Sequence, residues 1–141
     1  MRLVLDSSAA LPSVILEPVT PNAIRLIDEY RQGLHELLAP DIFPVETLNG
    51  LAKAERQKRI SVGTAFNFWK GIMVDSPVYH SHFPLLARAY AISASTKSAV
   101  YDCIYVALAE REGCELMTAD DKLLKNLQGR FPFIVSLAGL P

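Results

Sequence analysis

Short apolar runs along the chain alternate with longer stretches that have helical periodicity. The runs have the length and composition of buried strands, and they cover residues 2–5, 36–39, 115–118 and 133–136. Residues 77–82 fit a strand or an irregular segment. Strands that alternate with helices imply βαβ crossovers, because parallel neighbours need such a connection. The pattern therefore predicts an α/β fold with a mostly parallel sheet covered by helices.

Start and stop residues mark several of the helices between these runs. Thr20 is predicted to be the N-cap of a helix that ends at Gly33, and Ser98 the N-cap of a strongly apolar helix that ends at Gly113. An earlier helix begins just after position 6 and carries Pro12 near its first turn, where a missing N–H costs little.

Two central helices are predicted from apolar spacing. One runs from residue 41 to about 58, with Val45, Leu48, Leu51 and Ala52 on its buried side. The next begins near Ser61, and its apolar stripe is interpreted as core and less readily as a docking groove. That stripe consists of Val62, Ala65, Phe66, Trp69 and Met73. Further helices are expected over 83–92 and 122–127.

Length and composition indicate one domain, residues 1–141, with half of its residues hydrophobic. The chain carries 14 Lys and Arg against 15 Asp and Glu, so a nucleic-acid partner must be bound locally. No run approaches the roughly 20 apolar residues of a membrane span, and Asp6 interrupts the N-terminal run. Cys103 and Cys114 lack a C-x-x-C spacing. We therefore expect a cytoplasmic protein with no membrane partner.

Three aspartates stand alone among apolar residues, where an unpaired carboxylate is costly to bury. Asp6 is the only charged residue between positions 2 and 17, and Asp102 the only one between positions 97 and 110. Asp120 follows the predicted strand 115–118. The carboxyl ends of parallel strands share one edge of a sheet, so we expect these acids to converge there.

Glu46 is the fourth candidate, because its face of the predicted helix 41–58 mixes apolar and polar residues and carries a gap. Carboxylates brought together raise one another's pKa unless a cation lies among them. Mg²⁺ or Mn²⁺ suits such oxygen ligands better than zinc does. The sequence thus predicts a metal site formed by Asp6, Glu46, Asp102 and Asp120.

Each acid also has a local explanation. Asp6 and Asp120 fit helix N-caps, Asp102 fits a first-turn acid favoured by the helix dipole, and Glu46 fits a solvated side chain. None of these explanations accounts for the gathering of all four at one sheet edge. Asp121 is open as well: it is either a further ligand or, as we favour, a dipole partner in the first turn of a helix.

Two hydroxyls flank the acids in sequence. Ser8 is two residues after Asp6, and Thr118 is two residues before Asp120, so extended backbone turns each toward the side of its acid. They are candidates for holding water at the metal. The alternative, that Ser8 only helps to cap a helix and Thr118 only fills a strand, is equally open at this point.

Four basic residues fall within a stretch of seven residues, 53–59, at the end of the predicted helix that carries Glu46, offset only by Glu55. They are a candidate RNA-binding surface, although cations at a helix C-terminus also suit its dipole and are commonly just solvated. These residues are Lys53, Arg56, Lys58 and Arg59.

The ordered set of acids resembles the PIN domain, the fold of the toxin ribonucleases of VapBC type II toxin-antitoxin systems, over nearly the whole chain. The motifs that carry the resemblance are VLDSS at Asp6, PDIFPVETLNGLAKA at Glu46, and VYDCIYVALAEREGCELMTADDKLL, which supplies Asp102, Thr118 and Asp120. The chain departs from the family in Pro12, which interrupts a helix, and in Asp121, where many relatives carry a basic or polar residue.

The resemblance implies a PIN-like three-layer sandwich and Mg²⁺- or Mn²⁺-dependent hydrolysis of RNA phosphodiester bonds, with the four acids arranging the metal. It also implies a VapB-like antitoxin that binds a helical surface, and a homodimer. Three other readings stay open. They are an RNA-processing PIN nuclease outside toxin-antitoxin systems, a phosphoacceptor or phosphatase domain with Asp6 as nucleophile, and a non-catalytic binding module.

Overall fold

The computed structural model describes residues 1–140 and is built on a five-stranded sheet of order β3-β2-β1-β4-β5. Every neighbouring pair of strands is parallel. The strands are β1 (Arg2–Leu5), β2 (Glu36–Pro40), β3 (Val78–His80), β4 (Glu115–Thr118) and β5 (Ile134–Ser136). The predicted α/β fold is confirmed, and its sheet is wholly parallel.

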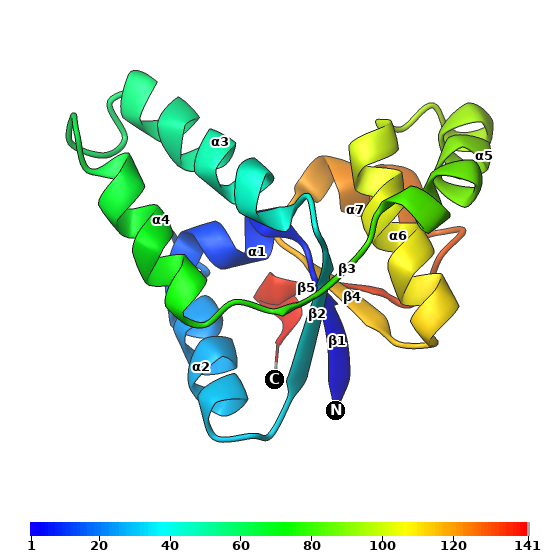
Figure 1. The fold of residues 1–141 in the computed structure, drawn as a ribbon, viewed down its shortest axis with the longest axis horizontal. Helices are drawn as coiled ribbons and strands as arrows, with labels where there is room; N and C mark the ends of the chain where they lie inside the picture. The colour runs from blue at the N-terminus through cyan, green and yellow to red at the C-terminus, as the bar shows by residue number, and fades with distance from the viewer. Residues whose placement is uncertain (141) are drawn as a thin grey trace.

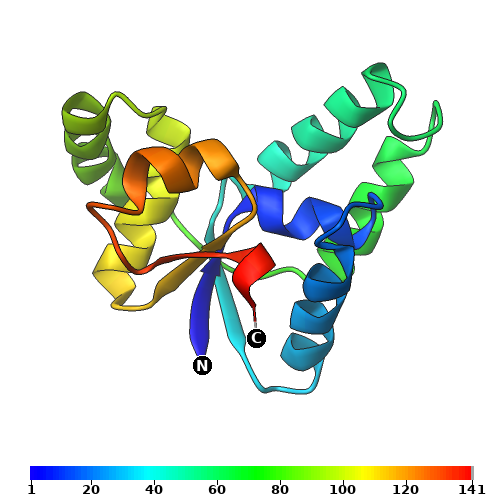
Figure 2. The ribbon, with the colours of Figure 1, turned by 180° about the vertical axis from the view of Figure 1, so that it is seen from behind.

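Helices cover both faces of the sheet, as two opposite views show (Figures 1 and 2). One face carries α1 (Ser7–Ala10), α2 (Thr20–Arg31), α3 (Phe43–Arg56) and α4 (Ala65–Val74). The other carries α5 (Leu86–Thr96), α6 (Val100–Glu112) and α7 (Asp121–Leu127). Short 3₁₀ turns lie at Leu11–Ser13, Phe83–Leu85 and Leu137–Gly139. This is the three-layer sandwich that the resemblance implies.

The strand order places a topological switch point beside β1. From β1 the chain winds outward through β2 to β3, and it then crosses to the far side of β1 to add β4 and β5. The connections that leave β1 and β4 therefore diverge to opposite faces of the sheet. Such a divergence opens a crevice at the carboxyl ends of the two strands, where ligands bind in open α/β sheets.

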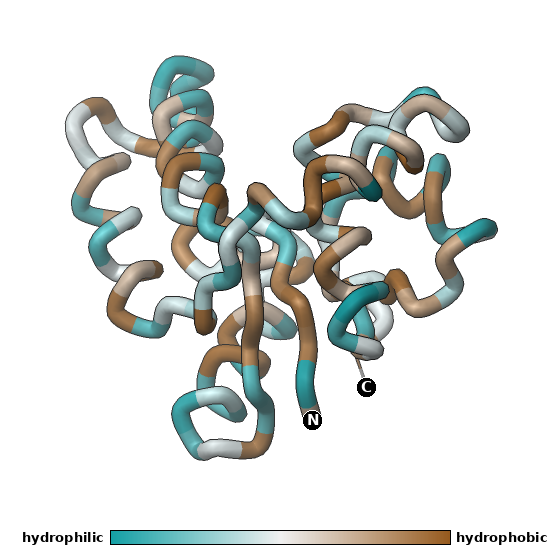
Figure 3. The backbone as a smooth tube through the Cα atoms, turned by 45° about the vertical axis from the view of Figure 1, so that its right-hand side comes forward, coloured by the Kyte–Doolittle hydropathy of each residue, from teal (hydrophilic) through white to brown (hydrophobic). Residues whose placement is uncertain are grey.

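The core is centred on the sheet and on α6, and the other helices each bury one side against them. The central strands carry apolar side chains on both faces, and the strand that starts at the N-terminus is hydrophobic over most of its length (Figure 3). In α6, every residue from Cys103 to Ala109 is buried. No helix within residues 1–140 combines the length and apolar character of a membrane span.

Several predicted helix starts are wrong by one to four residues. Val19, not Thr20, is the N-cap of α2, and the Thr20 hydroxyl instead closes the preceding turn through Glu17 and Ile15. Ala99 is the N-cap of α6, while the Ser98 hydroxyl is buried without a partner. Neither hydroxyl therefore accepts a hydrogen bond from the first turn of its helix.

The region around Pro12 and the stripe on α4 also differ from expectation. Pro12 lies in a 3₁₀ turn that ends α1 early, because proline has no N–H for the helical hydrogen bond. The next predicted helix begins at Ala65, not near Ser61. Val62 and Phe66 are 85% and 56% exposed, so only part of the predicted stripe belongs to the core.

Candidate active site

The carboxyl ends of β1 and β4 bring two of the predicted acids together. Leu5 pairs with Met117 in the sheet, and the Asp6 N–H continues this ladder by donating to the Met117 carbonyl at 3.0 Å. Asp6 is thus the first residue beyond β1, at the switch point. Asp120 follows β4 directly after a single alanine, on the neighbouring strand.

Asp6 is buried, with 4% of its surface exposed, and two hydroxyls hold its side chain. Ser8 Oγ donates to Asp6 Oδ2 at 2.5 Å, and Thr118 Oγ1 donates to the same oxygen at 2.9 Å. Burial raises the pKa of Asp6, the two hydroxyl hydrogen bonds oppose this rise, and the charge of Asp120 adds to it. No side-chain capping bond joins Asp6 to α1, so its N-cap explanation does not hold for the carboxylate.

Ser8 and Thr118 also fix the turn between β4 and α7. The Ala119 N–H donates to Ser8 Oγ at 3.0 Å, and the Asp120 N–H donates to Thr118 Oγ1 at 3.1 Å. Each hydroxyl therefore links Asp6 to the backbone that positions Asp120. The two auxiliary residues predicted from sequence do lie beside the acids, where they bind a carboxylate and a turn.

Asp120 is the N-cap of α7, so the local explanation given for this acid is confirmed. Its Oδ1 accepts from the N–H groups of Lys122 and Leu123, at 2.9 and 3.2 Å. Both bonds fall on one oxygen, so this cap fixes the orientation of the carboxylate and leaves Oδ2 unengaged by the helix. Capping and a role in the site are thus compatible for Asp120.

Asp102 lies in the first turn of α6, where the negative charges of the other acids act on its carboxylate. Burial is the largest cause of a rise in its pKa to about 7. Nearby negative charges raise it further, and these belong to Asp6, Asp120 and Glu46, while Lys122 partly offsets them. The four predicted acids therefore share one region of the molecule, as expected from their sequence positions.

Glu46 reaches the site from the first turn of α3. Burial raises its pKa, a contact with the Tyr105 hydroxyl lowers it, and the charge of Asp6 raises it again. Its Oε1 is buried without a hydrogen-bond partner in residues 1–140, so Glu46 is not simply a solvated side chain. The gap expected on this face is at Gly50, where Leu11 packs so closely that an added Cβ would lie 2.7 Å from its Cδ1.

The buried side of α3 is only partly as predicted. Leu51 is fully buried, but Val45 is 65% exposed, and Phe43 and Thr47 take the inward positions in the first turn of the helix. The helix is rotated relative to the predicted face. This rotation turns Glu46, next to Val45 in sequence, toward the sheet edge.

One buried polar residue beside the acids was not singled out by the sequence analysis. Tyr105 lies on α6, is 1% exposed, and has no hydrogen-bond partner for its hydroxyl among residues 1–140. In sequence it is hidden within a continuous apolar run, where a tyrosine is typical of core. Its spacing of three residues from Asp102 is the signal that places both on one helical face.

The remaining candidates are peripheral. Asp121 is exposed in the first turn of α7, in agreement with a dipole partner. All four basic candidates are exposed at or beyond the end of α3. Arg59 Nη2 lies 2.6 Å from Glu17 Oε1 in an ion pair, so this guanidinium is less available than its neighbours.

The donor chemistry of the four acids fits a hard divalent cation. All are carboxylates, Glu46 Oε1 is an unpartnered buried acceptor, and Asp102 is destabilised as an anion by its neighbours. As they lie, however, no three His, Cys, Asp or Glu side chains in the described chain are close enough to hold one ion together.

The chain has clear relatives among proteins of known family and structure. Residues 3–128 match the model of the PIN domain. Ribonuclease VapC3 of Pyrobaculum aerophilum is 32% identical over 143 residues, which cover 96% of this chain and 99% of the relative. Ribonuclease VapC9 of Mycobacterium tuberculosis is 30% identical over 139 residues, covering 94% of this chain and 97% of the relative.

A crystal structure of a protein from Pyrobaculum aerophilum has a similar fold. It matches with a TM-score of 0.69 at 20% identity and covers 99% of this chain and 95% of its own. The family model spans both strand ends that carry Asp6 and Asp120, and the curated relatives match over almost their full length. The chain therefore belongs to the PIN domain family, and its curated relatives in that family are VapC ribonucleases.

Proposed function

We propose that this protein is a metal-dependent endoribonuclease and the toxin of a VapBC-type toxin-antitoxin pair. The observation that carries the proposal is the gathering of Asp6, Glu46, Asp102 and Asp120 at the switch point of the sheet. There, burial and mutual repulsion raise the pKa of Asp102 to about 7. Such a site favours a cation, and the curated relatives that match over almost the whole chain are ribonucleases.

The four acids would hold Mg²⁺ or Mn²⁺. When bound, the ion supplies Lewis-acid polarisation of the phosphodiester and neutralises negative charge on its oxygens. The protein contributes oriented ligands: Asp6 is fixed by Ser8 and Thr118, and Asp120 by the N-terminus of α7. Without the cation these carboxylates would repel a phosphate, so they do not bind RNA by themselves.

The partners follow from the same assignment. RNA would contact the exposed basic residues Lys53, Arg56 and Lys58, which lie at and just beyond the C-terminal end of α3, the helix that carries Glu46. A VapB-like antitoxin and a second copy of this chain are further expected partners. These partners are part of the proposal, and the RNA sequence that is cleaved is left to experiment.

Substitution of the central acids tests the proposed activity. Asp6→Asn or Asp102→Asn should abolish Mn²⁺-dependent RNA cleavage, by at least about 100-fold, because removing a charged ligand weakens both metal binding and catalysis. Circular dichroism should show an unchanged fold. Glu115→Gln, an exposed acid on β4, is the matched control and should cleave like the parent protein.

Two results would reject the proposed metal site. Full activity of both aspartate variants would remove Asp6 and Asp102 from the site, and cleavage that withstands EDTA would indicate a contaminant or a different site. A crystal soaked in Mn²⁺ and read by anomalous scattering would then identify which of the four acids contact the ion and how many ions bind.

A further inference from the structure

The hydroxyl of Tyr105 is a buried polar group that packing does not explain. The side chain is 1% exposed, and its oxygen has no hydrogen-bond partner among residues 1–140. A phenylalanine would fill the same space without the cost of burying an unpaired hydroxyl. The oxygen atom therefore needs a role beyond the core.

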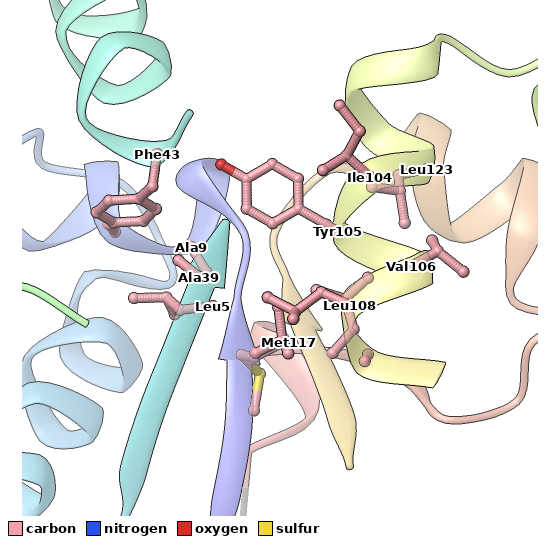
Figure 4. Packing of buried hydrophobic residues seen from close by; sticks show 14 of the residues in the cluster. Leu5, Ala9, Ala39, Phe43, Ile104, Tyr105, Val106, Leu108, Met117 and Leu123 are labelled. Atoms are coloured by element: carbon pink, nitrogen blue, oxygen red, sulfur yellow. The ribbon is translucent and has the colours of Figure 1, made fainter. Parts of the chain in front are cut away.

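The position of Tyr105 points its hydroxyl toward the candidate active site. It lies three residues after Asp102, so the two side chains share one face of α6. Figure 4 shows the hydroxyl directed away from α6, toward the end of β1 and the start of α3. Asp6 follows that strand directly and Glu46 lies on that helix. Burial is the largest cause of a raised pKa of Tyr105, the charges of Asp6 and Glu46 raise it further, and the Ser7 side chain lowers it.

A complementary atom lies in the same region. Glu46 Oε1 is the other buried side-chain oxygen at the site without a partner within the described residues. A tyrosine hydroxyl is a donor and a carboxylate is an acceptor, so each supplies what the other lacks. The remaining unpartnered buried groups belong to His35, His80 and Ser98, which lie outside α3 and α6.

We propose that the Tyr105 hydroxyl donates a hydrogen bond to Glu46 Oε1 and thereby positions this carboxylate for the metal. Tyr105 is a positioning residue, because it acts through Glu46 and touches neither metal nor RNA. The proposal about metal rests on the proposed function, whereas the hydrogen bond itself does not. Partners that orient a ligand in this way commonly change metal affinity about 10- to 100-fold when removed.

A double-mutant cycle in EDTA tests the hydrogen bond without metal. We expect Tyr105→Phe to shift the urea midpoint of unfolding when Glu46 is present and to shift it much less in the Glu46→Ala variant. The proposal is overturned if the midpoint shifts of the two single variants add up to the shift of the double variant. Tyr90→Phe, at an exposed tyrosine on α5, should add independently of Glu46→Ala. A slowly exchanging Tyr105 hydroxyl proton in NMR, lost in Glu46→Ala, gives the same answer without altering Tyr105.

Calorimetric titration with Mn²⁺ tests the positioning role. Tyr105→Phe should weaken Mn²⁺ binding about 10-fold. It should also lower kcat for RNA cleavage and leave KM for RNA unchanged. In the Glu46→Ala variant, Tyr105→Phe should have no further effect on either quantity. The positioning role is overturned if Tyr105→Phe and the parent protein bind Mn²⁺ equally well. It is also overturned if Tyr105→Phe causes the same loss of Mn²⁺ affinity with Glu46 present as in Glu46→Ala. If the parent protein binds no Mn²⁺ and cleaves no RNA while the urea cycle is coupled, the hydrogen bond stands and the proposed function fails.

Discussion

At the scale of single residues, the order around Asp6 comes from two hydroxyl groups. A carboxylate with 4% exposure loses most of its hydration, and only donors can offset that loss. Ser8 and Thr118 both donate to Oδ2, and both accept from backbone N–H groups of the β4–α7 turn. Each hydroxyl thus donates its one proton to Asp6 and accepts a backbone N–H from the turn, which links Asp6 to the backbone that positions Asp120.

Thr118→Val should therefore disturb the site more than its small change in shape suggests. The variant leaves the Asp120 N–H without its acceptor and removes one donor from Asp6, so we expect a loss of about 1 to 3 kcal/mol in the free energy of unfolding. Urea denaturation at pH 7 in EDTA measures the loss. Thr96→Val removes only a bond within α5, and equal losses in both variants would contradict the special role of Thr118.

Asp102 makes stability depend on pH in the metal-free protein. Its pKa is about 7 in the folded state against 3.8 for an ordinary aspartate, so the folded state binds the proton more tightly. The associated stability is fully present below pH 4 and is lost as pH rises through 7. Because the side chain is partly exposed, we expect the loss to be about 2 kcal/mol.

Asp102→Asn should remove this pH dependence. In EDTA at pH 8 the variant should be more stable than the parent protein, and the two should approach each other at pH 4. Thermal unfolding across this range provides the measurement, with Glu115→Gln as a control that keeps the parent slope. A parent protein whose stability rises steadily from pH 5 to pH 8 would contradict the raised pKa.

At the scale of elements, the strands and their terminal acids were predictable and the helix caps were not. Asp6 and Asp120 directly follow short apolar runs, and parallel pairing then forces both to one edge of the sheet. The predicted caps Thr20 and Ser98 were each wrong by one residue: the Thr20 hydroxyl bonds within the preceding turn, and the Ser98 hydroxyl has no partner in the described chain.

Side-chain rotation within helices was the harder problem. The pattern of α3 is compatible with several buried faces, and contacts with α4 and the turn at Leu11–Ser13 select the one that exposes Val45. Tyr105 escaped notice for a related reason, since the run from Cys103 to Ala109 is apolar on every side of the helix and shows no preferred face. Local sequence therefore located the acids, and tertiary packing determined which neighbours surround them.

The arm that ends in basic residues gives a test at this scale. Helix α3 leads away from the sheet, and its C-terminal end forms the tip of one arm (Figure 1). At 1.5 Å per residue, Lys53 lies about 10 Å farther along the axis than Glu46. An RNA strand that enters the site can therefore contact the site and this arm together.

Lys53→Glu combined with Lys58→Glu should weaken RNA binding and flatten its dependence on salt. Each lost contact with a single-stranded phosphate lowers the slope of log K against log salt by about 0.7. Binding of RNA to Asp6→Asn protein, which should not cleave it, measures the slope. The control is Lys97→Glu combined with Lys125→Glu, which changes the net charge by the same amount. Lys97 matches Lys58 because both have a positive φ. Equal slopes in both double variants would exclude α3 as the contact surface.

At the scale of the whole molecule, the fold concentrates negative charge at one place in a chain that is nearly neutral overall, with a formal charge of −1. The switch point assembles acids from four separate segments: the residue after β1, the helices α3 and α6, and the β4–α7 turn. Folding must bring these charges together before any ligand compensates them. The metal-free protein is consequently less stable than its apolar core permits, and a cation that binds the acids should recover that stability.

Mn²⁺ should therefore raise the melting temperature, and more at pH 8 than at pH 6. At pH 6 the cation must displace a proton from Asp102, whose pKa is about 7, whereas at pH 8 the carboxylate is already ionised. At an Mn²⁺ concentration of about 100 times Kd, the gain corresponds to about 2.7 kcal/mol. The shift should disappear in the Asp6→Asn, Asp102→Asn double variant, which retains every surface carboxylate outside the site. A shift that persists in this variant, or one that is larger at pH 6, would mean that Mn²⁺ binds elsewhere and that the four acids do not form its site.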